Sequence, residues 1–415
     1  MMAYDMPSNL VPKLRFPEFQ SAGEWEPKIM GDIASFFKGK GLPKSMLSTD
    51  GTRQCIHYGE LFTVYPEVIE TVYSRTDLDL DENLFLSAVD DVLMPTSDVT
   101  PNGLAKACCV KLRDVIIGGD ILVIRTDQRK VGGEFLARYI RHLEPRVLQL
   151  VTGSTVYHLY ATSLKKLDLK VPSQSEQQKI ADCLGSLDAL IAAEGRKLES
   201  LRQHKQGLMQ QLFPQPGETV PRIRFPEFQD RPEWNCLQLE ELETEGRIEL
   251  GRGKVISHAD MRANPGPHPV YSSSVIDEGL MGTYGDYLFD EELISWSVDG
   301  GGHYFYRPKH KFSVTNVSGY MRVLCGDIVC RFLAYQLQRL HRSQTFDYQQ
   351  KAHPSVIRAL YTVGLPEPNE QRMISDCLTS LDARLIGQTR RLGALKQHKQ
   401  GLTQQLFPSL EEESR

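Results

Sequence analysis

Two long, closely matching segments constrain this chain more than any other feature. Residues 176–214 and 370–408 align without a gap at an offset of 194, and both close on HKQGL followed by QQLFP. No proline interrupts either segment before Pro214 and Pro408. Apolar residues recur in steps of three and four, which is the spacing of a coiled-coil seam. At 1.5 Å per residue each helix would span roughly 58 Å, which is too long for the core of a small domain.

Each predicted seam has ten positions, of which eight are apolar and two are polar. If the helices run antiparallel, one register pairs Glu194 with Lys399 and Lys205 with Gln388, and such polar pairs fix register more than they add stability. The alternative is two separate surface helices, each packed on its own domain. The predicted apolar seam residues are Ile180, Leu184, Leu187, Ile191, Leu198, Leu201, Leu208 and Leu212, with Ile374, Leu378, Leu381, Leu385, Leu392, Leu395, Leu402 and Leu406.

A second repeat marks where each half of the chain begins. RFPEFQ occurs at 15–20 and again at 224–229, followed at the same distance by Trp25 and Trp234. The two bodies that follow have dissimilar sequences, and each is long enough to form a domain. The predicted division is a first domain with its lead-in segment (1–172), a first long helix (173–214), a linker (215–220), a second domain (221–366), a second long helix (367–408) and a tail (409–415).

Both bodies show strand-like segments first, then a helical segment, then a short strand that leads into the long helix. The helical spacing covers residues 135–151 and 327–343, and the short strands are LDLKVP and LYTVGLP. This order predicts α+β domains. The expected fold is therefore two similar globular α+β domains separated by two long helices that form an antiparallel coiled coil.

Composition and cysteine spacing narrow the setting of the chain. The net charge is −5, and no apolar run approaches 18 residues, so we expect no membrane span. The beginning of the sequence lacks the apolar core of a signal peptide, which favours a cytoplasmic protein. None of the eight cysteines forms a CxxC pair, so we expect reduced thiols and no metal site.

Motifs for catalysis are missing, whereas basic segments occur at matching places. There is no GxxxxGK[ST] phosphate loop, no HExxH and no Asn/Asp-Pro-Pro-aromatic tetrapeptide, so we predict no catalytic residue. Glycine-rich basic loops follow each lead-in, and a segment at 304–311 mixes aromatic and basic residues; both suit phosphate contact. Solvated turns and a half-buried strand that ends in a charged turn are the alternatives. The candidate nucleic-acid contacts are Lys38, Lys40, Lys44, Arg53, Arg252, Lys254, Arg307, Lys309 and Lys311.

The paired segments EQQKI…HKQGLMQQLFP and EQRMI…HKQGLTQQLFP, the RFPEF lead-ins, and IHYGELF, TGSTVYHL and VTNVSGYMRVL carry a resemblance. Over essentially its whole length the chain resembles the specificity (S) subunit of type I DNA restriction–modification systems. The resemblance implies two target-recognition domains, each reading one half of a bipartite, asymmetric site in double-stranded DNA. It also implies that the coiled coil sets the gap between the halves.

The resemblance further implies partners and a division of labour. The coiled coil would dock two methyltransferase (M) subunits, which hold S-adenosylmethionine, and restriction/motor (R) subunits would then join. This chain itself would hold no cofactor and would not be an enzyme. Two alternatives remain at this point: a coiled-coil protein-interaction adaptor, or a DNA methyltransferase or nuclease with unrecognised motifs.

Overall fold

The structure, a computed structural model, describes residues 11–79, 84–299, 303–342, 344, 346 and 351–408. The predicted tail at 409–415 lies outside the described residues. The chain divides into two compact units. The first comprises residues 1–194 together with 391–415, and the second comprises residues 195–390. Each unit therefore contains a body and a stretch of both long helices.

The first unit is built of short strands with helices between them. Its strands are β1 (Glu26–Ile29), β2 (Ala34–Lys38), β3 (Arg53–Ile56), β4 (Val68–Ile69), β5 (Arg75–Thr76), β6 (Asp91–Pro95), β7 (Ser97–Asp98), β8 (Cys108–Val110), β9 (Ile116–Ile117), β10 (Ile121–Thr126), β11 (Tyr157–His158) and β12 (Asp168–Val171). Its short helices are α1 (Met30–Ile33), α2 (Glu60–Thr63), α3 (Gly133–His142), α4 (Glu144–Leu148) and α5 (Ala161–Leu164). The main sheet has the order β2-β10-β6-β8-β4, beside smaller sheets β1-β12, β7-β11 and β5-β3-β9.

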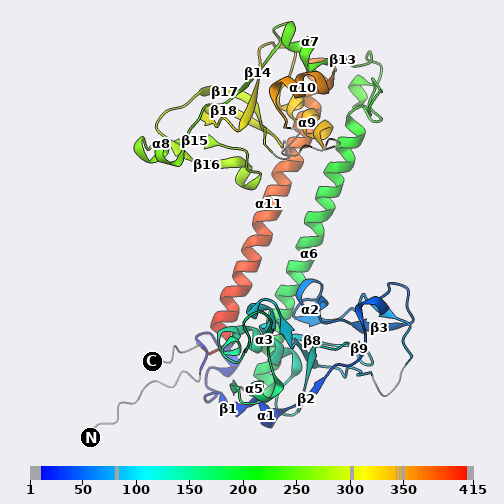
Figure 1. The fold of residues 1–415 in the computed structure, drawn as a ribbon, viewed down its shortest axis with the longest axis vertical. Coiled ribbons are helices and arrows are strands. Elements are labelled where there is room, and N and C mark those ends of the chain that lie inside the picture. Colours follow the sequence, from blue (N-terminus) through cyan, green and yellow to red (C-terminus); the bar gives the residue numbers. More distant parts are fainter. Residues whose placement is uncertain are drawn as a thin grey trace. The chain divides into compact units, whose positions relative to one another are not determined.

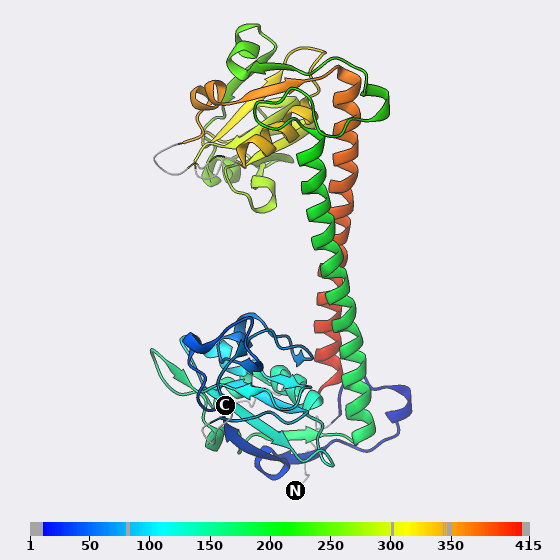
Figure 2. The same ribbon diagram turned by 90° about the vertical axis from the view of Figure 1, so that its right-hand side faces the viewer.

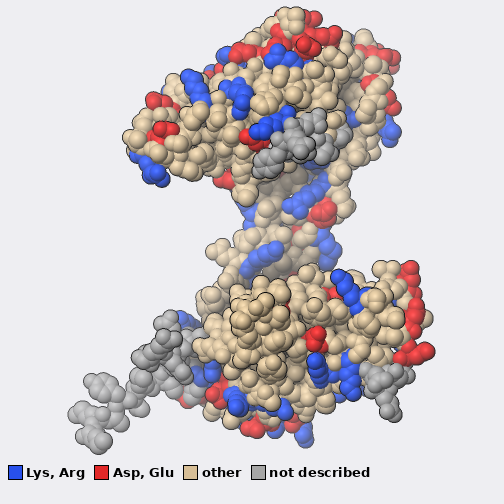
Figure 3. Space-filling view, viewed as in Figure 1, with Lys and Arg blue, Asp and Glu red and all other residues tan. Residues whose placement is uncertain are grey.

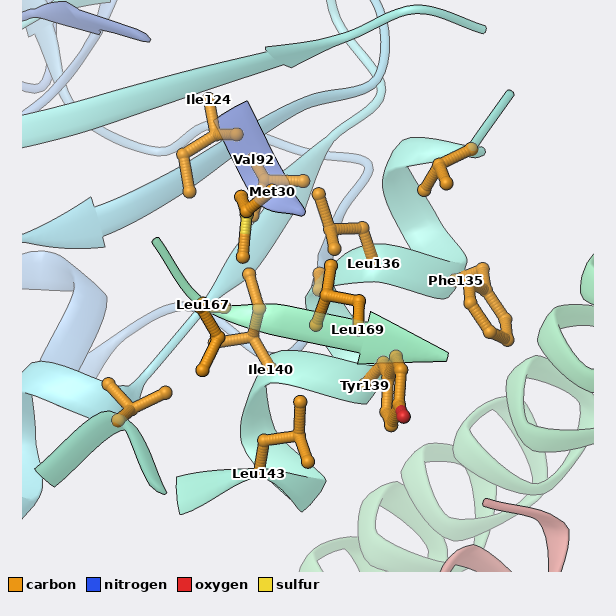
Figure 4. Close-up of a cluster of buried hydrophobic side chains, with 14 of the residues drawn as sticks. Met30, Val92, Ile124, Phe135, Leu136, Tyr139, Ile140, Leu143, Leu167 and Leu169 are labelled. Carbon is orange, nitrogen blue, oxygen red and sulfur yellow. The ribbon is translucent and has the colours of Figure 1, made fainter. Parts of the chain in front are cut away.

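Helix α3 packs its apolar face on the main sheet of the first unit. Residues Phe135, Leu136, Tyr139 and Ile140 are buried at helical spacing among strand residues such as Val92, Ile124 and Leu169 (Figure 4). The predicted helix at 135–151 is divided into α3 and α4, and Pro145 lies in the first turn of α4. Proline has no N–H to donate to the preceding turn, so one continuous helix could not run through this position.

The second unit combines a larger sheet with four short helices among its described residues. Its strands are β13 (Asn235–Gln238), β14 (Ile248–Arg252), β15 (His268–Tyr271), β16 (Leu280–Tyr284), β17 (Phe289–Ser297), β18 (Tyr304–Val314), β19 (Ser318–Val323) and β20 (Thr362–Leu365). The sheet order is β14-β19-β17-β18-β15-β16, and β13 pairs with β20. The helices are α7 (Leu239–Thr244), α8 (His258–Ala263), α9 (Cys330–His341) and α10 (Pro354–Leu360). Both units are thus α+β, and β12 and β20 are the predicted short strands before the long helices.

The long helices are α6 (Gln174–Leu212) and α11 (Pro368–Leu406), each 39 residues long. In each unit a stretch of α6 lies beside a stretch of α11 and runs in the opposite direction (Figures 1 and 2). All sixteen predicted seam residues are buried or half-buried. Burial of one face along both helices rules out the alternative of two separate surface helices.

The ion pairs between the long helices correct the predicted register. Lys205 pairs with Asp382 at 2.5 Å, six residues before the predicted partner Gln388. Glu194 pairs with Arg391 at 2.8 Å, eight residues before the predicted partner Lys399.

Lys399 instead pairs with Asp188 at 2.6 Å and with Glu67 at 2.9 Å. The helices are therefore shifted by about one heptad from the prediction. The physical reason is that a lysine gains more from a carboxylate than from a neutral amide.

The QQLFP that closes each long helix enters the core of a unit. Phe407 stacks on Tyr139 in the first unit, with ring centroids 5.0 Å apart and planes 5° apart. Phe213 meets Trp234 edge-on in the second unit, at 6.1 Å. Because α11 starts in the second unit and α6 starts in the first, each core is completed by a helix that began in the other unit.

The first turn of each long helix is held in the same way in both units. Gln177 accepts a hydrogen bond from the backbone N–H of Gly132 at 3.0 Å and donates to Pro172 O at 2.9 Å. Gln371 accepts from Val329 N at 2.8 Å and donates to Pro366 O at 2.8 Å. The glutamine repeated at the start of each long helix therefore fastens that helix to the turn before α3 or α9.

Candidate nucleic-acid interface

The basic loop of the first unit presents its lysines to solvent. Gly41 and Leu42 both have left-handed backbone (φ 58° and 56°), and the Leu42 side chain is buried against Cys55 and Ile116. This apolar anchor holds the loop to the unit, and Lys40 and Lys44 on either side of it are exposed.

Lys38 and Arg53 flank this loop on strands. Lys38 ends β2 and is exposed, with its Nζ 3.4 Å from Asp120. Arg53 begins β3 and is also exposed. All four predicted basic residues of this unit are therefore free to meet solvent or a ligand on at least one side.

An open groove of ≈ 510 Å³ lies beside Lys38. Phe37, His158 and Tyr160 line it, and the His158 and Tyr160 rings stack with centroids 6.0 Å apart. Tyr160 is 53% exposed. Sequence reasoning did not select these two rings as contacts, although they lie in and next to the TGSTVYHL segment. An aromatic pair after a Gly/Ser/Thr turn is the signal that could have found them.

In the second unit four predicted residues are exposed. Arg252 ends β14 and donates a hydrogen bond to the Asn316 carbonyl, and Lys254 follows it two residues later. Lys309 and Lys311 lie on β18, so the charged turn that was the alternative for this segment is instead part of a continuous strand. The Nζ of Lys311 lies 4.8 Å from the centroid of the Tyr287 ring.

Arg307 differs from the other predicted contacts because it is buried. Its side chain is 2% exposed, its Nε donates to Ser295 Oγ at 2.9 Å, and its Nη2 donates to the Glu278 carbonyl at 2.6 Å. The guanidinium also stacks over Tyr271, 3.7 Å from the ring centroid. Burial lowers the pKa of Arg307 to about 10. The prediction that Arg307 binds phosphate is therefore corrected, because its side chain is buried and bonded to partners inside the unit.

Positive and negative side chains are interspersed on the surfaces of the units. Figure 3 shows Lys and Arg side chains scattered among Asp and Glu on one face of each unit. With a net charge of −5, the chain offers local basic sites and no broad basic coat.

Possible metal ligands do not form a cluster in the part of the chain that the structure describes. No group of three or more His, Cys, Asp and Glu there could hold a metal ion. All eight cysteines are free, and burial raises the pKa of the Cys55 thiol to about 12, so it stays protonated near neutral pH. No described helix is long and apolar enough to cross a membrane.

The sequence and the fold of this chain match those of known proteins. Residues 22–203 and 234–396 match the family model described as the type I restriction modification DNA specificity domain. A putative type I specificity subunit of Mycoplasma pneumoniae, S.MpnORF365P, is 25% identical over 229 residues, which cover 54% of this chain and 79% of that protein. A second one, S.MpnORF289P N-terminus, is 36% identical over 104 residues, or 25% of this chain and 55% of that protein.

A solved structure shows the same fold. The S subunit of a type I restriction–modification system from M. genitalium superposes with a TM-score of 0.65 at 16% sequence identity, covering 97% of this chain and 100% of that chain. The two family matches together span most of the chain, so it belongs to the type I restriction–modification DNA specificity family.

Within that family the chain is the DNA specificity subunit of a type I restriction–modification system. The subunit forms part of the type I complex and is itself non-catalytic. This assignment decides against the two alternatives, a protein-interaction adaptor and a methyltransferase or nuclease with unrecognised motifs.

Proposed function

We propose that the two domains, at 1–172 and 221–366, each read one half of a bipartite, asymmetric site in double-stranded DNA. The long helices at 173–214 and 367–408 set the number of unread base pairs between the halves. One observation carries this proposal: the two bodies are anchored to the long helices by the same contacts, although the bodies themselves differ. The Arg15–Glu176 and Arg224–Glu370 ion pairs, with the glutamine contacts described above, fasten the two bodies to their helices in the same way. The main sheets of the two bodies, however, differ in strand order.

The equivalent attachment of the two bodies to the long helices supports this proposal. Identical fastening presents each body to the helices in the same manner, as two readers of one duplex require. Different sheets and loops then offer different side chains to base edges, so the two half-sites differ in sequence. Exposed Lys38, Lys40, Lys44, Arg53, Arg252, Lys254, Lys309 and Lys311 are the proposed phosphate contacts.

The partners complete the activity that this chain lacks. Two methyltransferase (M) subunits dock on the helices and supply S-adenosylmethionine, and restriction/motor (R) subunits join that complex. No described part of this chain offers a metal cluster, and its own residues contribute recognition and spacing.

Mapping of methylated bases tests the proposal directly. DNA from cells that express this chain with its M subunit should carry one bipartite motif with a fixed gap. Exchange of residues 26–172 for the body of another S subunit should change one half of the motif and leave the other half and the gap intact. A change in both halves, or a motif without a gap, contradicts the proposal.

A further inference from the structure

The connection between β15 and β16, which we call the 272–279 loop, lies at the edge of the second unit's sheet (Figure 1). Apolar side chains are exposed at its tip. Ile276 is 83% exposed, which makes it the most exposed large apolar side chain in the described part of the chain, and Val275 is 50% exposed. Polar residues at this place would cost a solvated loop no stability. The presence of two exposed apolar side chains therefore indicates that the tip contacts an apolar group.

The backbone of this loop is held in a conformation that L-residues rarely adopt. Asp277 and Glu278 both have φ of 50°, and Gly279 follows with φ of 83°. Elsewhere in the described chain no two neighbouring non-glycine residues have positive φ. Strain of this kind persists only where the surroundings impose it, and it concentrates at ligand-binding segments.

Buried Arg307 is hydrogen-bonded to the strained segment. Its Nη2 donates to the carbonyl of Glu278, the second of the two strained residues, at 2.6 Å. Its Nε is held by Ser295 Oγ, and its guanidinium is packed on Tyr271, the last residue of β15. A closing hydrogen bond from Ser272 N to Gly279 O, at 2.7 Å, completes the base of the loop. The tip is therefore preorganised.

Two exposed cations are attached beside the base of the loop. Thr315 donates its N–H to the Tyr271 carbonyl at 2.8 Å and its hydroxyl to Ser272 Oγ at 3.2 Å. The same turn, residues 314–316, accepts two further hydrogen bonds. The backbone N–H of Lys254 donates to Val314 O at 3.1 Å, and the Arg252 guanidinium donates to Asn316 O. The base of the 272–279 loop and the segment that carries Arg252 and Lys254 are thus hydrogen-bonded to the same turn.

We propose that the 272–279 loop is a base-reading element of the second domain, in which Ile276 contacts the 5-methyl group of a thymine in the major groove. Arg252 and Lys254 hold neighbouring phosphates, and Arg307 is a positioning residue that shapes the loop. DNA supplies both kinds of group that this surface matches, since phosphates attract the cations and a thymine methyl is the apolar feature of the major groove. The inference rests on the proposed function of the domain.

The test uses the complex of this chain with its M subunit and DNA carrying the mapped motif. The half-site of the second domain is the half that stays unchanged when residues 26–172 are exchanged. Each thymine of that half-site is replaced in turn by deoxyuridine, which lacks only the methyl group. The wild-type complex should lose about fourfold in affinity at one position, the effect of removing one buried methyl-sized contact.

Variants assign the methyl contact to the loop. Ile276→Ala should bind thymine and uracil DNA equally at that position, and Arg307→Lys should reduce the same discrimination. Arg252→Ala should weaken binding to both DNAs by the same factor. Leu324→Ala is the matched control: Leu324 is 52% exposed at the opposite end of β14 and β19, and its variant should discriminate as the wild type does.

The outcomes separate this inference from the proposed function. If the wild-type complex methylates no bipartite motif, the proposed function fails. If it does so but Ile276→Ala retains full thymine–uracil discrimination, the inference is overturned while the function stands. A half-site without thymine on either strand overturns it as well, and so does an Ile276→Ala variant that loses only binding of the M subunit, since the tip would then meet a protein.

Discussion

Arg15 and Glu176 form a two-pronged ion pair inside the first unit. The Nε and Nη2 atoms of Arg15 each lie 2.7 Å from a carboxylate oxygen of Glu176, and Nη1 donates to the Ala22 carbonyl. Arg224 and Glu370 repeat this arrangement in the second unit at 2.9 and 2.6 Å. The repeated RFPEFQ is thereby explained: its arginine fastens the lead-in to the first turn of a long helix.

Removing Arg15 should destabilise the first unit strongly. Glu176 is 1% exposed, so Arg15→Met leaves a buried carboxylate without its cation, and we expect a loss of about 3–5 kcal/mol. Denaturant unfolding followed by hydrogen exchange at α3 measures the loss. Lys28→Met is the control, because its partner Glu26 is 72% exposed and the expected loss is much smaller than for Arg15→Met. Similar small losses in both variants would falsify a structural role for the Arg15–Glu176 pair.

Truncation of Phe407 or Phe213, the aromatic residues that close the long helices, should destabilise the unit whose core contains the ring. Phe407→Ala removes a buried ring that stacks on Tyr139, and a loss of about 3–5 kcal/mol is expected. Hydrogen exchange should accelerate in α3 for Phe407→Ala and in α9 for Phe213→Ala. The reverse assignment would show that each closing segment serves the unit in which its helix begins.

A double-mutant cycle can check the register of the long helices. Lys205→Met and Asp382→Asn should show a coupling energy of about 1 kcal/mol, because their charges are 2.5 Å apart and partly shielded from water. Lys205→Met combined with Gln388→Ala serves as the comparison and should be additive. Coupling to Gln388 in place of Asp382 would restore the register expected from the sequence.

Salt dependence should reveal which lysines meet phosphate. If Lys254 contacts one phosphate, Lys254→Ala should lower the slope of log K against log salt by about 0.9 and leave the recognised sequence unchanged. Lys28→Met, on the edge strand β1, should keep the wild-type slope. Because the chain carries a net charge of −5, the slope for the isolated chain should also be shallower than for the complex with M subunits. Equal slopes would assign the electrostatic contacts to this chain alone.

The sequence alone was sufficient for the features that depend on local pattern. Uninterrupted heptad spacing predicts α6 and α11, because a helix without proline must bury its apolar stripe somewhere. The order of strands and helices predicts α+β bodies, and the repeated motifs indicate the specificity family. The exposure of Lys40 and Lys254 also follows from a local signal, since glycine-rich basic loops remain at the surface.

Other features depended on how distant segments meet in space. The burial of Arg307 is set by Tyr271 and Ser295 on neighbouring strands, and nothing in the local sequence distinguishes it from exposed Lys309. The helix register follows Asp188 and Asp382, which the heptad pattern does not count as seam residues. The heptad pattern specifies that each helix has an apolar stripe, but ion pairs beside that stripe select among registers that bury it equally well.

The units themselves are the clearest case of a property that only the tertiary structure decided. In sequence, each half of the chain runs from RFPEFQ to QQLFP. In space, however, Phe407 at the end of the second half completes the first core, and Phe213 at the end of the first half completes the second core. The sequence alone determined the two lead-ins, the two bodies and the two long helices. Only the tertiary structure decided which body receives which helix end, because a 39-residue helix carries its closing aromatic residue away from the body where it starts.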